Sequence, residues 1–121
     1  MIPHRKVLAF SATVEIATSV GLLVAPVLVV RLLLGDELAG SGLIVARAFG
    51  VALLSLSLAV WPRGPATAQA CRAMALYNAG LAIYLTWLGV TAPVGGPLLW
   101  PAVLIHAIVA VVLARPLREE P

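Results

Sequence analysis

Long apolar runs separated by short polar connections dominate the chain. Four of them approach the roughly 20 residues that a helix needs to cross the ~30 Å hydrocarbon core of a bilayer. These runs cover residues 7–30, 43–61, 73–92 and 98–114. A proline stands one or two residues after each of the last three runs, as is common beyond helix ends. The pattern predicts an all-α integral membrane protein, a four-helix bundle formed by a single domain over residues 1–121.

The composition agrees with this class. Of the 121 residues, 62% are hydrophobic and 11% are charged, whereas soluble domains carry about 25% charged residues. The net charge of +3 lies at the ends of the apolar runs and forms no basic stripe with interleaved aromatic residues, so nucleic acid is not an expected partner. The single cysteine, Cys71, excludes an internal disulfide and a multi-cysteine metal site.

The basic residues predict how the helices are oriented. Only Arg31 and Arg47 flank the runs on one side, and the other six lie on the opposite side: Arg5, Lys6, Arg63, Arg72, Arg115 and Arg118. Cytoplasmic ends of membrane helices are enriched in Lys and Arg. Both termini are therefore expected in the cytoplasm.

Three polar residues lie deep within the apolar runs. Glu15 is eight residues past Val7, and His106 is eight residues before Ala114. With a rise of 1.5 Å per residue, both lie about 12 Å from the cytoplasmic end, and Asn78 lies about 8 Å from it. Depth therefore allows Glu15, His106 and Asn78 to form a cluster, but depth alone does not bring their faces together.

The helical faces extend this candidate site. On the first run, polar residues recur at i, i+4 and i+7, and such a face is expected to point into the bundle because lipid cannot satisfy it. On the third run, two tyrosines share a face beside Asn78. The predicted ligand-binding or proton-coupled residues are Glu15, His106, Asn78, Tyr77, Tyr84, Ser11 and Thr18.

Glu15 allows two interpretations. An ionised carboxylate in mid-membrane costs about 3 kcal/mol on insertion scales, and an intramembrane ionisable residue is a functional hypothesis by default. The alternative is a neutral Glu15 that only forms hydrogen bonds between helices. A Glu–His pair can serve as acid and base, but no paired nucleophile accompanies it, so an enzyme is not favoured and no catalytic residue is assigned. One Glu and one His are too few ligands for structural zinc, so no metal or other cofactor is expected.

A second set of charges lies on the predicted outer side. Arg47 is four residues into the second run, and Asp36 and Glu37 precede it in the connection. These two carboxylates are expected to pair with Arg47, or with Arg31. The alternative is that Arg47 contacts an anion or a lipid headgroup, since the guanidinium matches phosphate geometry.

The layout resembles the DoxX-like group of small four-helix bacterial membrane proteins. The resemblance covers most of the chain and is carried by Glu15 in the first helix, by Arg47 and Gly50 within "ARAFG", and by four spans with both ends inside. It implies a multi-pass protein of the bacterial inner membrane. Related folds bind small hydrophobic ligands or are subunits of membrane complexes.

Small multidrug resistance transporters are similar in length and span count, and their early glutamate matches Glu15. The chain departs from them because the first helix does not end in a lysine-containing turn, the second helix lacks the expected aromatic and proline pattern, and His106 has no counterpart. This resemblance implies only a proton-carrying role for Glu15.

Two functions follow as hypotheses. The leading one is a membrane protein that binds an apolar or lipid-like small molecule within the bundle, or an accessory subunit of a larger membrane complex. The other is a proton-coupled small-molecule transporter that works as a homodimer through Glu15.

Overall fold

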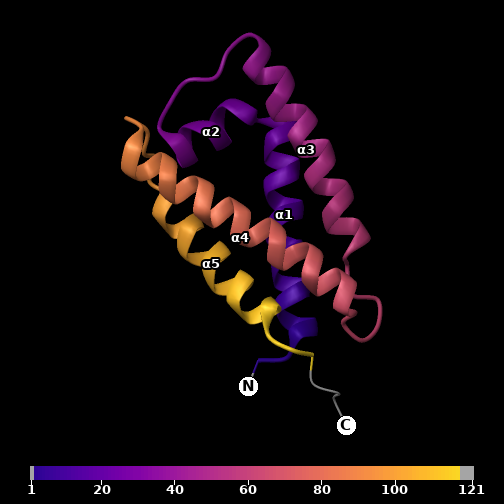
Figure 1. The fold of residues 1–121 in the computed structure, drawn as a ribbon. Helices are drawn as coiled ribbons and strands as arrows, with labels where there is room; N and C mark the ends of the chain where they lie inside the picture. Colours follow the sequence, from indigo (N-terminus) through magenta and orange to yellow (C-terminus); the bar gives the residue numbers. More distant parts are fainter. Residues whose placement is uncertain (1, 118–121) are drawn as a thin grey trace.

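The computed structural model describes residues 2–117, which form helices joined by short connections, with no strand among them (Figure 1). Three helices are long and apolar enough to cross a membrane, namely α1, α3 and α4. The all-α class and helices fit for a membrane are thus confirmed. The helices are α1 (His4–Val24), α2 (Pro26–Leu34), α3 (Ser41–Ala59), α4 (Ala68–Thr91) and α5 (Leu99–Ala114).

The first predicted span, residues 7–30, is wrong as a continuous helix because it breaks at Ala25. Ala25 has φ −139° and ψ 61°, outside the helical region, and Pro26 begins α2. Proline lacks an N–H group, its ring clashes with the carbonyl four residues earlier, and it disfavours helical geometry in the residue before it. The same ring suits the first position of a new helix. The described residues therefore form five helices where four were predicted.

The last predicted span, residues 98–114, corresponds to α5. This helix is apolar but has 16 residues, a length of about 24 Å that falls short of the ~30 Å core. A fourth span therefore stays a prediction, as does the cytoplasmic position of the termini, and Arg118 lies outside the described residues.

Helix α4 begins five residues earlier than the predicted run 73–92. Thr67 caps it, because its side chain accepts a hydrogen bond from the Ala70 amide over 3.2 Å. A threonine in this position satisfies one of the amide groups that the first helical turn leaves without a partner. The connection after α3 is correspondingly shorter than the sequence indicated.

The helices pack chiefly as two pairs, α1 with α3 and α4 with α5. Helix α1 also contacts α4 and α5, which cross it obliquely (Figure 1). The first and last described residues lie at the same end of the molecule, where the His4 ring nitrogen Nε2 is 3.0 Å from the Arg115 carbonyl oxygen. The crossing of α1, α4 and α5 positions the candidate site described below.

At the opposite end, α2 is bound to the connection between α4 and α5. Three amides of that connection donate to the last carbonyls of α2: Gly95 N to Leu34 O (2.8 Å), Gly96 N to Leu33 O (3.2 Å) and Leu98 N to Leu32 O (2.9 Å). These carbonyls have no partner within the helix itself. The approach requires glycine at position 96, because a Cβ there would lie 2.2 Å from the Leu32 oxygen.

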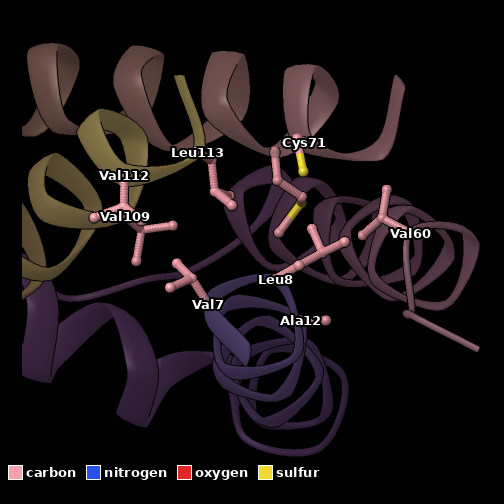
Figure 2. Close-up of a cluster of buried hydrophobic side chains, with 9 residues drawn as sticks. Val7, Leu8, Ala12, Val60, Cys71, Val109, Val112 and Leu113 are labelled. Atoms are coloured by element: carbon pink, nitrogen blue, oxygen red, sulfur yellow. The ribbon is translucent and has the colours of Figure 1, made fainter. Parts of the chain in front are cut away.

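An apolar core fills the end of the bundle near the termini. Its buried side chains come from α1, α4, α5 and the residue after α3, and Figure 2 shows them pointing toward one another. The cluster consists of Val7, Leu8, Ala12, Val60, Cys71, Met74, Val109, Val112 and Leu113. This core holds α4 and α5 against α1 next to the polar residues.

Candidate functional site

Polar side chains from three helices meet where α1, α4 and α5 cross. Glu15 and Ser11 come from α1, Asn78 from α4 and His106 from α5, and at most 7% of any of these residues is exposed. Tyr77 of α4 is half-buried beside them. We call these five residues the buried network. The cluster that depth allowed is therefore formed.

Asn78 is the central member of the network. Its Nδ2 donates to the Met74 carbonyl (2.8 Å) and to the Ser11 hydroxyl (3.1 Å), and its Oδ1 lies 2.6 Å from Nδ1 of His106. The Met74 carbonyl can only accept, so the amide nitrogen must face it and Oδ1 must face the imidazole. Nδ1 of His106 therefore carries a hydrogen and donates it to Asn78.

Glu15 interacts mainly with Tyr77. The tyrosine hydroxyl donates to Oε2 of Glu15 over 3.2 Å. Oε1 of Glu15 is 3.6 Å from Nδ1 of His106, too far for a good hydrogen bond. The Tyr77 and His106 rings meet edge to face, with centroids 6.1 Å apart and an interplanar angle of 84°. Glu15 and His106 are thus close, but it is Asn78 that accepts the hydrogen bond from the imidazole N–H.

The fully buried polar atoms of the network all have hydrogen-bond partners. No buried side-chain nitrogen or oxygen of residues 2–117 lacks a hydrogen-bond partner. In this same part of the chain, no three His, Cys, Asp or Glu side chains gather into a possible metal site. Hydrogen bonds between membrane helices average about 0.6 kcal/mol and reach about 1.7 kcal/mol. These contacts favour the interpretation of Glu15 as a residue that joins helices.

Two of the seven predicted residues lie outside the network. The Thr18 hydroxyl donates to the Val14 carbonyl of its own helix (3.0 Å). Tyr84 is 55% exposed and stacks on Trp87, with ring centroids 6.0 Å apart. Tyr84 and Tyr77 share a helical face, but α4 crosses α1 obliquely (Figure 1), so α1 covers that face only near the crossing.

The charges at the α2 end pair differently from the first expectation. Arg31 forms the ion pair with Glu37, at 3.7 Å, and both side chains are exposed. Nε of Arg47 instead donates to the Leu23 carbonyl over 3.3 Å. The break after α1 explains this choice, because the last carbonyls of a helix lack intrahelical donors. Within residues 2–117, Arg47 therefore binds the end of α1 and forms no ion pair with Asp36 or Glu37.

A groove of about 490 Å³ runs between α4 and α5, on the part nearest the termini. Three buried members of its lining, Cys71, Ala110 and Leu113, form its floor, and two of these also belong to the apolar core in Figure 2. The full lining is Ala68, Cys71, Arg72, Ala75, Leu76, Ala79, Ala110, Leu113, Ala114, Arg115, Pro116 and Leu117.

None of the seven residues predicted to bind a ligand lines this groove. A sequence signal for it exists, because Ala68, Ala75 and Ala79 recur at i, i+7 and i+11 and so share one face of α4. Small residues on a membrane helix face usually indicate close helix packing. Here that face is left partly open, which the sequence did not indicate.

Fold and site together define an all-α protein with membrane-compatible helices, a closed polar network and an open groove. Comparisons with family models, curated proteins and solved structures find no match. The resemblance to DoxX-like proteins therefore stays a prediction.

Proposed function

We propose that this is an integral membrane protein that binds an apolar, lipid-like molecule in the groove between α4 and α5. The groove itself carries the proposal. Its volume of about 490 Å³ lies within the range of roughly 300–1,000 Å³ that is typical of ligand pockets. Alanines supply much of its lining, so the two helices leave space that a slender apolar molecule can fill.

The dimensions of the groove favour a molecule from one leaflet of a bilayer. Along α4 the lining extends from Ala68 to Ala79, a distance of about 16 Å at 1.5 Å per residue. One leaflet contributes half of the ~30 Å hydrocarbon core. An acyl chain of that leaflet can therefore lie along the whole groove.

The buried network has a supporting role in this proposal. Its hydrogen bonds join α4 and α5 to α1 through Asn78 and His106, and Ala110 on the groove floor is one helical turn from His106. The network thus fixes the helix spacing that leaves the groove open. The ligand contacts the groove lining, and Glu15 does not touch it.

The transporter hypothesis receives less support. It requires Glu15 at a face shared by two copies, and Glu15 is 2% exposed within one chain, where Tyr77 and His106 of that chain contact it. Normal transport by a Glu15→Gln variant in a liposome flux assay would rule that hypothesis out.

Filling the groove tests the proposal. The double substitution Ala75→Leu/Ala79→Leu places two larger side chains one turn apart in the lining. The matched control, Ala48→Leu/Ala52→Leu, makes the same change at two exposed positions of α3. Native mass spectrometry of protein released from lipid nanodiscs is expected to show bound lipid on the wild type and the control but not on the filled variant. Equal lipid retention by all three would refute the proposal.

A further inference from the structure

The groove carries positive charge at one end only. Arg72 and Arg115 line it where α4 begins and α5 ends, and both residues are exposed. Deeper in the groove, Ala75, Ala79 and Ala110 offer only apolar surface. A molecule that matches this lining is apolar along most of its length and anionic at one end.

No carboxylate of the described chain offsets these two arginines. The acidic residues within 2–117 are Glu15, which lies inside the buried network, and Asp36 and Glu37, which lie in the α2–α3 connection at the opposite end of the bundle (Figure 1). The salt bridges among the described residues do not include Arg72 or Arg115. Within residues 2–117, neither arginine therefore has an ion-pair partner.

The start of α4 adds to the positive electrostatic potential at this end of the groove. Ala68, the first residue of α4, also lines the groove. The amide groups of a first helical turn carry a partial positive charge that favours anions, and this effect falls off beyond that turn. A negative group between Arg72 and Arg115 would lie near this helix end as well as near both guanidinium groups.

We propose that the groove selects an anionic phospholipid of the surrounding bilayer over a zwitterionic one. The phosphate of the headgroup lies against Arg72 and Arg115, and an acyl chain lies along Ala75, Ala79 and Ala110. Guanidinium groups bind phosphate oxygens through paired N–H donors, and basic pockets between membrane helices are known to bind acidic headgroups. This inference rests on the proposed function, because it requires a lipid in the groove.

The test compares two lipids on one protein. Nanodiscs contain equal amounts of phosphatidylglycerol and phosphatidylcholine, and native mass spectrometry measures the ratio of the two lipids retained. Each basic residue near an anionic surface contributes roughly five-fold, so Arg72→Gln/Arg115→Gln is expected to lower the ratio roughly 25-fold. Arg72→Lys/Arg115→Lys, which keeps both charges, is expected to retain most of the preference.

Arg5→Gln/Arg63→Gln is the matched control. It removes two charges from the same end of the bundle without touching the groove lining, and it is expected to leave the ratio near the wild-type value. An equal fall in this control would mean that overall charge causes the preference, and the inference would be wrong. An unchanged ratio in the Arg72→Gln/Arg115→Gln variant would also overturn it.

The failure of this inference is distinguishable from failure of the proposed function. Suppose that Ala75→Leu/Ala79→Leu loses both lipids while Arg72→Gln/Arg115→Gln keeps the anionic preference. The groove then binds lipid, but Arg72 and Arg115 do not cause the preference, so the proposed function stands and the inference falls. If the filled variant retains both lipids as the wild type does, both are wrong.

Discussion

Gly96 is the position where one methyl group is expected to separate α2 from the rest of the bundle. A Cβ at position 96 would lie 2.2 Å from the Leu32 oxygen and 2.8 Å from the Arg31 oxygen. Real Cβ atoms essentially never approach other atoms closer than 3.0 Å. Both clashing atoms belong to the backbone, so no side chain can rotate away. The α4–α5 connection must therefore shift away from the end of α2 in a Gly96→Ala variant.

The cost follows from the hydrogen bonds that this shift breaks. Three amides, those of Gly95, Gly96 and Leu98, donate to α2 at 2.8–3.2 Å. A typical intramolecular hydrogen bond contributes about 0.5–1.5 kcal/mol net, so losing all three lowers the free energy of unfolding by about 3 kcal/mol. Alanine also reduces the entropy of the unfolded chain, which returns about 0.4–1 kcal/mol. The expected net loss is about 2 kcal/mol, which is large beside a total of roughly 5–15 kcal/mol.

Gly95→Ala is the control for this prediction. A Cβ at Gly95 meets no heavy atom within 4 Å, and Gly95 does not have a positive φ. This variant should be as stable as the wild type or slightly more stable. Reversible unfolding in mixed micelles, followed by tryptophan fluorescence and circular dichroism, measures both variants. A Gly96→Ala protein as stable as Gly95→Ala would refute the reasoning.

Three further predictions concern the network and the helix break. In ¹⁵N NMR spectra of the protein in bilayers, His106 should carry a hydrogen on Nδ1, because Asn78 Oδ1 accepts from it over 2.6 Å; a bare Nδ1 would contradict the assigned orientation of the amide. Tyr77→Phe removes only the hydroxyl that donates to Glu15 and should lower the free energy of unfolding in mixed micelles by about 1 kcal/mol. A loss of 3 kcal/mol or more would mean that the contact between the two rings has also been lost. Pro26→Ala restores an N–H group at the break between α1 and α2, so α1 can continue through it. Hydrogen exchange should then show a protected amide at residue 26. A rapidly exchanging amide there would mean that packing, not proline, ends α1.

Much of the helical structure was predictable from local properties of the chain. A bilayer requires long apolar segments with internally satisfied backbone groups, and the runs at 43–61 and 98–114 agree with α3 and α5 to within two residues at each end. The break before Pro26 was missed although its signal is local, since proline disfavours helix in the residue before it. The early start of α4 depends on the Thr67 cap, a signal that is also present in the sequence.

The depth of the polar residues in the membrane was predictable, but their hydrogen-bond partners were not. The rise per residue placed Glu15, Asn78 and His106 at similar depths in the membrane, which allowed a cluster. It could not show that Asn78, rather than Glu15, accepts the imidazole hydrogen. It also failed for Tyr84, which lies on the face of Tyr77 but is exposed, because the oblique crossing of α4 covers only part of that face.

The sequence by itself determined the all-α class, helices fit for a membrane and a small set of buried polar residues, because helix length, hydropathy and residue rise are properties of each segment alone. The helix crossing decided which of those residues meet and left the groove open between α4 and α5. Contacts between segments far apart in the chain depend on the angle and spacing at which helices pack. That geometry is the combined result of all side chains at the crossing and cannot be read from any one helix.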